Sequence, residues 1–169
     1  MSKTSYRIKR AESPAEVEGA VRAVALAWQQ SYQGLVPDEE IALRQREEVI
    51  ARRMMEWAMA SQEGAWFWIV MDSRDGRVVG AANAGPARDQ DAPEILELVM
   101  LYLTDEVKGT GAASPLLQMA VGDMDCYLWV LEGNERAIAF YAKEGFVADG
   151  EKRTGDVGST EIRMVRRAE

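Results

Sequence analysis

The sequence predicts an α/β (α+β) fold in which a mixed central sheet of about six to seven strands is flanked by about four helices. Two observations lead to this prediction. Apolar residues recur at helical spacing in the first third of the chain, and after residue 64 short apolar runs of strand length alternate with helical segments. Neither a repeat nor a linker divides the chain, so residues 1–169 are expected to form a single domain.

Two helices are expected in the N-terminal third. Residues 13–16 form a capping box with proline at the first helical position, and the helix that they start is expected to run to about Ser31. A segment containing glycine and proline then breaks the helical pattern. Asp38 is expected to cap a second helix that ends near Gly64.

Strands dominate the pattern after residue 64. Residues 65–71 and 78–84 are joined by a turn rich in aspartate and glycine, which predicts an antiparallel hairpin. The long strand 94–103 is apolar on both faces beyond Glu97 and is therefore expected to be central. The other expected elements are strands at 6–9, 126–131, 146–148 and 162–165, and helices at about 112–122 and 135–143.

The chain contains no histidine, which excludes an imidazole base, a Ser–His or Cys–His pair and a metal site built from histidine. No metal site is expected. The single cysteine, Cys126, lies in an apolar run and is interpreted as a small buried hydrophobe rather than a reactive thiol. Because one cysteine cannot form an internal disulfide, a reducing cytoplasmic location is expected.

The net charge of −8 argues against one class of partner, and the distribution of apolar residues argues against another. A surface of that sign repels phosphate backbones, so no nucleic-acid partner is expected. The longest strongly apolar run, residues 65–71, is far shorter than the roughly 20 residues of a membrane-spanning helix. The first ten residues contain no apolar segment of the signal-peptide type, so no membrane association is expected.

The most informative chemistry lies in residues 108–114, between a strand and a helix. Small residues there would let backbone N–H groups approach an anion that the helix dipole favours. This predicts a phosphate cradle, and the alternative is a plain glycine-rich connector. A dinucleotide fingerprint with Glu132 on the ribose is a second cofactor hypothesis, but too few residues follow Glu132 to supply the further βαβ units of a Rossmann domain.

Four segments, in this order, resemble the GCN5-related N-acetyltransferase (GNAT) family. They are residues 97–103 (ELVMLYL), 108–113 (KGTGAA), 129–141 (WVLEGNERAIAFY) and 145–146 (GF). Residues 31–37 are similar to the loop between the family's first two helices, so the likeness covers nearly the whole chain. The resemblance implies the GNAT-type acyl-CoA N-acyltransferase fold and transfer of an acetyl group from acetyl-CoA to a primary amine. The amine would attack the thioester directly in a ternary complex, without a covalent enzyme intermediate.

The resemblance also implies which residues bind acetyl-CoA, the co-substrate. The loop at residues 108–114 would hold the pyrophosphate. The backbone of the long strand 94–103 would bind the pantetheine arm and the thioester carbonyl, and the helix at residues 135–143 would line the arm. The matching positions are Lys108, Gly109, Gly111, Ala112, Ala113 and Ser114 in the loop, Leu101 and Leu103 on the strand, and Asn134, Ala137 and Tyr141 on the helix. Apart from the resemblance, Asn134 is a candidate helix cap.

Two positions depart from the family's pattern. Lys108 replaces the usual glutamine or arginine, which keeps a positive charge but loses the planar fork. Pro115 has no N–H and disfavours helical angles at the residue before it, so the helix is expected to start late and fewer amides are expected to point at the anion.

Two residues are candidates for the proton transfers. Tyr141 matches the tyrosine that in many family members protonates the departing thiolate, and its alternative role is that of a core aromatic. Glu97 matches a family glutamate and is the leading candidate for the base that deprotonates the amine. Its alternative role is that of a carboxylate at a strand end. Glu94 or a chain of water molecules could replace Glu97 as the base.

Trp28 and Tyr32 match the region that lines the acceptor side of the family's cleft, with a core position as the alternative for Trp28. The segment from Arg88 to Glu106 contains six carboxylates and one arginine, a net charge that would attract a cationic acceptor. The alternative is an acidic loop that is simply solvated. A small-molecule or peptide amine is therefore expected as the acceptor. Exposed positions on the closing strands could support a homodimer. The alternative function is a CoA-binding sensor or interaction module on the same fold, without efficient turnover.

Overall fold

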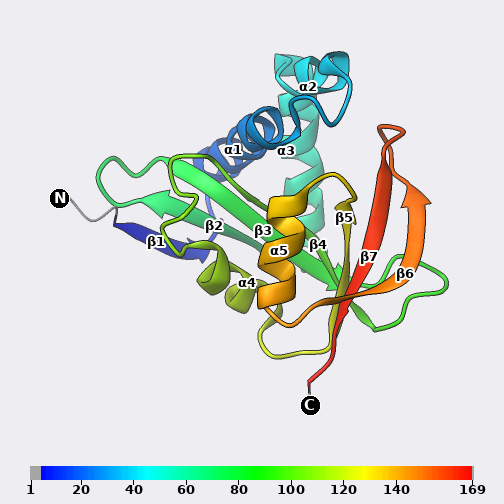
Figure 1. Cartoon of the computed structure of the whole chain (residues 1–169). Helices are drawn as coiled ribbons and strands as arrows, with labels where there is room; N and C mark the ends of the chain where they lie inside the picture. The colour runs from blue at the N-terminus through cyan, green and yellow to red at the C-terminus, as the bar shows by residue number, and fades with distance from the viewer. Residues whose placement is uncertain (1–4, 169) are drawn as a thin grey trace.

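A seven-stranded sheet in the order β1-β2-β3-β4-β5-β7-β6 organises the computed structural model, which describes residues 5–168 (Figure 1). All neighbouring strands are antiparallel except β4 and β5, which are parallel. This mixed sheet confirms the predicted fold class. The strands are β1 (Tyr6–Arg10), β2 (Phe67–Asp72), β3 (Val78–Pro86), β4 (Leu96–Leu103), β5 (Cys126–Leu131), β6 (Val147–Thr154) and β7 (Thr160–Arg166).

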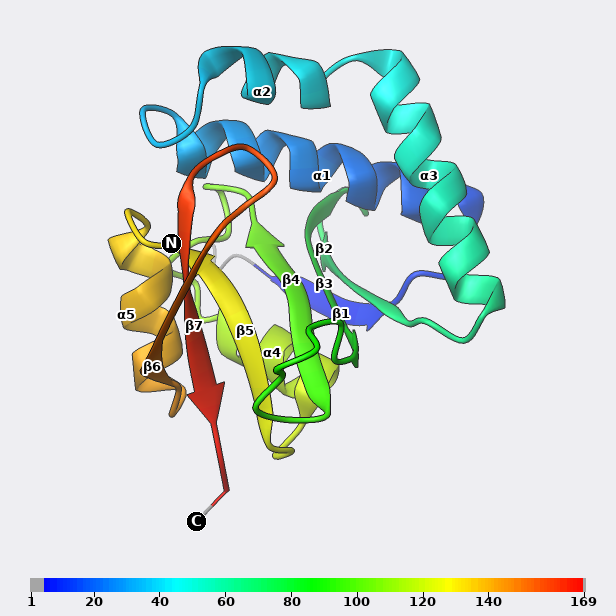
Figure 2. The same ribbon diagram turned by 90° about the vertical axis from the view of Figure 1, so that its right-hand side faces the viewer.

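Five helices flank the sheet in the described part of the chain, one more than predicted. They form one group on each side of the sheet (Figure 2). The first group is α1 (Pro14–Tyr32), α2 (Asp38–Arg44) and α3 (Glu47–Gln62), and the second is α4 (Ala113–Val121) and α5 (Glu135–Lys143). Between residues 5 and 168, no helix combines the length and the apolar character needed to cross a membrane.

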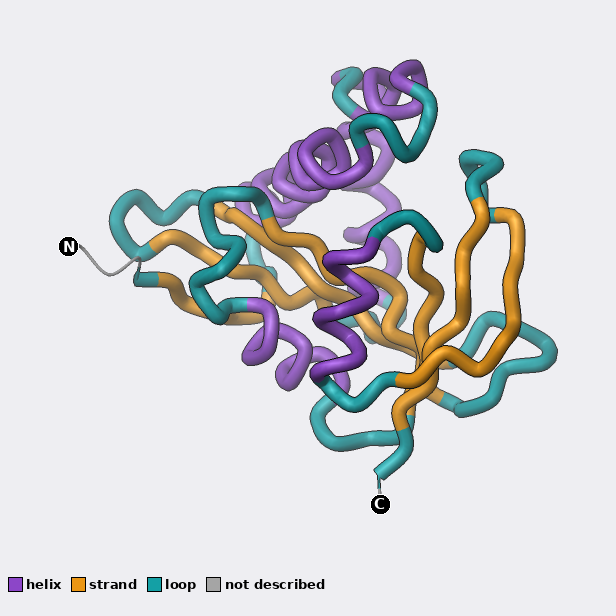
Figure 3. The backbone as a smooth tube through the Cα atoms, viewed as in Figure 1, coloured by secondary structure: helices purple, strands orange, loops and turns teal. Residues whose placement is uncertain are grey.

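The additional helix arises because the predicted second helix is broken. Gln45 donates a hydrogen bond from its side-chain amide to the carbonyl oxygen of Ala25 on α1, at 2.7 Å, and Arg46 takes an extended conformation. The chain therefore turns between α2 and α3 (Figure 3). The periodicity of Ile41 and Val49 is compatible with one continuous helix, so it does not reveal the turn. Asp38 is the first residue of α2 and not its cap.

The other N-terminal prediction, the capping box of α1, is confirmed. The Ser13 hydroxyl accepts a hydrogen bond from the amide of Glu16 at 3.1 Å, and the Glu16 carboxylate accepts from the amide of Ser13 at 3.2 Å. The ammonium of Lys9 also binds this carboxylate, at 2.8 Å. The hydrogen bond from Lys9, followed by those from the backbone, lowers the pKa of Glu16 to about 2. The start of α1 is thereby tied to β1.

The core has a layer on each face of the sheet. On the α1 side, Ala20 and Trp57 pack with apolar residues of β2 and β3. On the α5 side, Tyr141 packs with Leu128 and with Cys126, which is fully buried, as predicted.

The parallel pair β4 and β5 separates soon after it forms. The two strands are in register at a single residue pair, Glu97 with Tyr127, near the start of each strand. Beyond that pair the strands diverge, as Figure 2 shows. Backbone groups on the facing edges are therefore left without the partners that a continued sheet would supply.

Close packing between β3 and β4 depends on Gly80. A Cβ atom at this position would lie 2.4 Å from Cδ2 of Leu103 and 2.9 Å from the carbonyl oxygen of Tyr102. Both contacts are shorter than van der Waals separation. Strand β4, which borders the gap to β5, therefore needs a glycine at position 80 on its other neighbour, β3.

We expect Gly80→Ala to lower the free energy of unfolding by about 1–3 kcal/mol, because the added methyl group overpacks this contact. Gly85→Ala, on the same strand but with open space around the added atom, is the matched control and should leave stability unchanged or slightly improved. Urea denaturation of both variants measures the difference. Equal stabilities would contradict the packing role.

Candidate active site

A cleft of about 700 Å³ opens where β4 and β5 diverge. Its walls come from α1, α2, α3, β4, the loop before α4, β5, α5 and the β6–β7 hairpin. Apart from the fallback base Glu94, the structure brings the residues predicted for the site to this one cleft. They are Trp28, Tyr32, Glu97, Leu101, Leu103, Lys108, Gly109, Gly111, Ala112, Ala113, Ser114, Asn134, Ala137 and Tyr141.

The glycine loop presents open space and free amides to the cleft. Gly109 and Gly111 have φ angles of +78° and +87°, conformations that favour glycine, and nothing lies within 4 Å of a Cβ built on either residue. Within the described chain, no backbone carbonyl accepts a hydrogen bond from the amides of residues 111–114. Such amides at a helix start form an anion-binding surface.

The prediction that Pro115 delays the helix is wrong. The helix α4 begins at Ala113, two residues before the proline. Proline is tolerated there because the amides of the first helical turn have no intrahelical partner, so its missing N–H costs no hydrogen bond. The backbone N–H groups of the residues that precede Pro115 therefore still point outward from the start of α4.

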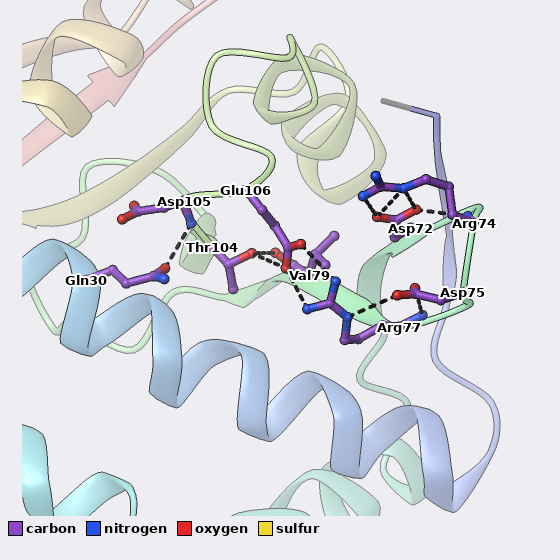
Figure 4. A network of polar contacts seen from close by, with 9 residues as sticks. All are labelled: Gln30, Asp72, Arg74, Asp75, Arg77, Val79, Thr104, Asp105 and Glu106. Carbon is purple, nitrogen blue, oxygen red and sulfur yellow. Dashed lines mark hydrogen bonds and ion pairs between the residues drawn. The ribbon is translucent and has the colours of Figure 1, made fainter. Parts of the chain in front are cut away.

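A polar network fixes the end of β4 and the chain entering the loop (Figure 4). The amide and hydroxyl of Thr104 both donate to the carbonyl oxygen of Val79, at 2.9 and 3.2 Å. The amide of Asp105 donates to the side chain of Gln30 on α1 at 2.8 Å. Arg77, in the β2–β3 hairpin, holds the carboxylate of Glu106 with two hydrogen bonds. The loop is therefore anchored to both α1 and the neighbouring hairpin.

Lys108 lines the cleft, but its ammonium group is already engaged. It donates to the hydroxyl of Ser31 at 2.9 Å and to the carboxylate of Asp105 at 2.8 Å. The side chain is 17% exposed. Its charge thus links the loop to the last turn of α1.

The backbone of β4 faces the cleft at Leu101 and Leu103. Backbone N–H and C=O groups alternate in direction along a strand. Since the amide of Thr104 donates to Val79 on β3, the backbone of Tyr102 also faces β3. The backbone groups of Leu101 and Leu103 therefore face the divergence from β5.

Three predicted residues lie on one face of α5. Asn134 caps the helix, since its side-chain oxygen accepts from the amide of Ala137 at 3.2 Å, and Tyr141 follows one turn after that. The Tyr141 ring packs edge-on against Phe146, with centroids 5.6 Å apart. Its hydroxyl lines the cleft and makes no hydrogen bond to residues 5–168. Burial, with a contribution from nearby Tyr102, raises the pKa of Tyr141, so the hydroxyl retains its proton at neutral pH.

A cluster of aromatic side chains forms the opposite wall. The Tyr32 hydroxyl donates to the hydroxyl of Tyr102 at 3.3 Å, and the Trp28 ring meets Tyr32 edge-on at a centroid distance of 4.6 Å. Tyr32 is buried and Trp28 is half-buried. Burial and the neighbouring phenol of Tyr102 raise the pKa of Tyr32. Both predicted residues thus combine packing with a position on the cleft.

Glu97 lies at the closed end of the divergence and is only 1% exposed. Arg88 holds both of its carboxylate oxygens, with Nε and Nη2 donating at 3.0 and 2.7 Å. The Tyr127 hydroxyl, which donates to Asp89 at 2.7 Å, lies 3.4 Å from the same carboxylate. The fallback candidate, Glu94, pairs with Arg167 and does not line the cleft.

The acidic segment that predicted a cationic acceptor is neutralised by arginines and a lysine. Every one of its six carboxylates has a cationic partner within 4 Å. The pairs are Asp89–Arg153, Asp91–Arg163, Glu94–Arg167, Glu97–Arg88, Asp105–Lys108 and Glu106–Arg77. Most of these partners lie far away in the sequence, so a local charge count overestimates the negative field. A cationic acceptor stays a prediction.

Several cleft residues were missed by sequence reasoning. Tyr102 lies within a segment that resembles the family, but its position carried no prediction. Arg44 and Arg53 come from α2 and α3, while Arg153 and Glu161 come from the strands that close the sheet. No local pattern marks these four side chains, because only the folded chain brings them to the cleft.

Comparison with known proteins identifies the family. The model of the "Acetyltransferase (GNAT) family" matches residues 24–146, from within α1 to the residue before β6. The chain belongs to the GNAT family. The segments that resemble it in the sequence all lie within this match.

Relatives of this GNAT-family chain occur in mycobacteria. Proteins of Mycobacterium bovis and Mycobacterium tuberculosis, both named uncharacterized N-acetyltransferases, are 36% identical to it over 106 residues. The alignment covers 58% of this chain and 65% of each relative.

A solved structure supports the fold over almost the full length. The PaiA N-acetyltransferase from Thermoplasma acidophilum, in complex with coenzyme A, matches with a TM-score of 0.72 and 22% identity. The match covers 97% of this chain and 99% of that protein. At this level of sequence identity, the similarity is evidence for a shared fold.

Removing Arg88 tests whether it stabilises buried Glu97. We expect Arg88→Met to lower the free energy of unfolding by about 1–3 kcal/mol, because a buried carboxylate loses its charged donors. Adding Glu97→Gln should recover part of this loss, which a double-mutant cycle measures. Arg52→Met, which breaks the exposed pair with Glu56, is the control and should change stability by less than about 1 kcal/mol. Strictly additive losses would contradict the coupling.

Proposed function

We propose that this GNAT-family chain is an acetyl-CoA-dependent N-acetyltransferase that acts on a primary amine by direct attack on the thioester. The transfer takes place in a ternary complex without a covalent enzyme intermediate. The observation that carries the proposal is the single cleft that joins an anion-binding loop to an unpaired strand edge and a protonated phenol. Acetyl-CoA, when bound, supplies the activated acetyl group.

The residues around the cleft suit the parts of this co-substrate. The amides of residues 111–114 would hold the pyrophosphate at the start of α4. The backbone groups of Leu101 and Leu103 would hydrogen-bond the pantetheine arm and the thioester carbonyl. Asn134 and Ala137 would line the arm. The coenzyme A in the structurally similar Thermoplasma protein and the names of the mycobacterial relatives support this assignment.

Tyr141 is proposed as the acid that protonates the departing thiolate. Its hydroxyl makes no hydrogen bond to the described chain, lines the cleft and keeps its proton at neutral pH. These properties suit a proton donor. Backbone donors on β4 and the positioning of two substrates would supply the remaining rate enhancement.

The base that deprotonates the amine is proposed to be Glu97 or a water molecule that it holds. Glu97 is close to the cleft, and Arg88 keeps its carboxylate oriented. A water molecule between this carboxylate and the amine would let the proton leave without breaking the ion pair. The acceptor is a small-molecule or peptide amine, and the protein is proposed to act in the cytoplasm.

One observation favours the alternative of a CoA-binding module without efficient turnover. Arg88 donates to both carboxylate oxygens of Glu97, so both oxygens are already engaged in an ion pair. On that alternative, acetyl-CoA would bind but no amine would be acetylated. A broad panel of amines assayed for release of free CoA separates the two functions.

Acetyl-CoA should raise the thermal stability of the protein, by about 2.7 kcal/mol at a concentration 100 times its Kd, whereas NAD should not. Gly111→Val should abolish this gain because the side chain fills the loop. Gly76→Val is the matched control, since Gly76 has a similar positive φ of +72° but lies in the β2–β3 turn. The control should keep the gain. If neither ligand stabilises the protein, residues 108–114 are a plain connector.

Tyr141→Phe should lower kcat by about 100-fold or more, since the departing thiolate loses its acid. The Kd for acetyl-CoA should change by less than about threefold, because only one hydroxyl is removed. Steady-state kinetics and calorimetry measure the two effects. Tyr6→Phe, on β1, is the control and should leave both unchanged. An unaltered kcat in Tyr141→Phe would remove the acid role.

A further inference from the structure

Two arginines on the aromatic side of the cleft have no anionic partner in the described chain. Arg44 ends α2 and Arg53 lies on α3, and both line the cleft. Neither guanidinium forms a salt bridge or a side-chain hydrogen bond with residues 5–168, and the Nε atom of Arg44 is fully buried without an acceptor. We propose that this pair binds an anionic group, a carboxylate or a phosphonate, on the amine acceptor. The inference rests on the proposed acetyltransferase function.

Within residues 5–168, no carboxylate forms a salt bridge with Arg44. Its guanidinium carbon lies 3.5 Å from the centroid of the Trp28 ring, which holds the group against the wall. Burial and the charge of Arg53 lower the pKa of Arg44, and the carboxylates of Glu40 and Asp156 oppose this effect from beyond salt-bridge distance. A buried charged donor without an acceptor is costly, and natural sites rarely keep one without a purpose.

The other basic residues around the cleft are occupied or lie elsewhere. Arg88 is held by Glu97, Arg153 by Glu161 and Lys108 by Asp105. Arg136 and Lys143 both belong to α5, next to the part of the cleft proposed for acetyl-CoA. Among residues 5–168, the pair formed by Arg44 and Arg53 is the one that combines guanidinium groups without a salt bridge and a place beside the aromatic wall.

The position of the pair assigns the anion to the acceptor rather than to acetyl-CoA. Helices α2 and α3 lie on the opposite face of the sheet from α4, whose start carries the proposed pyrophosphate loop (Figure 2). The neighbours of Arg44 are Trp28 and Tyr102, on the side predicted for the acceptor. The fork of an arginine matches the two oxygens of a carboxylate or phosphonate. The acceptor class is thus a primary amine that also bears an anion, such as a free amino acid or an aminophosphonate.

Matched acceptor pairs test the inference in the wild-type protein. Each pair consists of an amino acid with a free carboxylate and the corresponding carboxamide, assayed by release of CoA from acetyl-CoA. The carboxylate member should have a kcat/KM at least about tenfold higher, as expected for one charged hydrogen-bonded contact. Equal values, or a preference for the carboxamide, would overturn the inference but leave the proposed acetyltransferase function intact.

Variants assign the preference to the arginines. Arg44→Gln and Arg53→Gln should each raise the KM for the carboxylate acceptor about tenfold. The KM values for the carboxamide and for acetyl-CoA should not change. Arg44→Lys should recover only part of the loss, because it restores the charge without the fork. Arg52→Gln, an exposed neighbour on α3 outside the cleft, is the matched control and should behave as wild type. Equal losses for both acceptors would overturn the inference.

A binding measurement keeps the test independent of turnover. Calorimetry with the CoA-saturated protein compares an N-acetyl amino acid with its carboxamide. Tighter binding of the carboxylate form, lost in Arg53→Gln, supports the inference even if no amine is acetylated, in which case the proposed function alone fails. Equal or undetectable binding of the two compounds, in a protein that binds CoA, overturns the inference.

Discussion

The parting of β4 from β5 after a single residue pair is the constraint on which the rest of this molecule depends. A parallel pair that continued would satisfy its backbone groups internally and would leave no space between the strands. Here the edge of β4 near Leu101 and Leu103 remains open, and helices on both faces of the sheet border the gap. Gly80 keeps β3 tight against β4, so the open edge faces β5 alone.

The rule around this gap is that a buried charged group has a hydrogen-bonding partner. Glu97 is almost completely buried and has Arg88 as a partner, while Asp89 receives hydrogen bonds from Tyr127 and Trp129. Paired groups of this kind orient the backbone and side chains that enclose the cleft. Arg44, whose Nε has no acceptor, is the exception to the rule.

Sequence reasoning succeeded where the determinants are local. Residues 126–131 and 135–143 were predicted with the observed bounds, because an apolar run and a capped amphipathic helix are short-range signals. It failed where distant contacts decide. The turn between α2 and α3 depends on Gln45 reaching Ala25, and β6 extends to Thr154 as a polar, exposed edge strand that pairs with β7 without an apolar pattern. The loop residues of the cleft were likewise predictable, whereas Arg44 and Arg53 were not.

The last turn of α1 contributes to both ends of the cleft: it contacts the chain before the glycine loop and carries residues of the aromatic wall. Ser31 accepts a hydrogen bond from the ammonium of Lys108, and Gln30 accepts one from the amide of Asp105, so the helix is tied to the chain that leads into the glycine loop, residues 108–114. The same turn carries Trp28 and Tyr32, which form the aromatic wall. Both halves of the cleft are therefore attached to the same helical turn. They share one support rather than resting on separate elements of the fold.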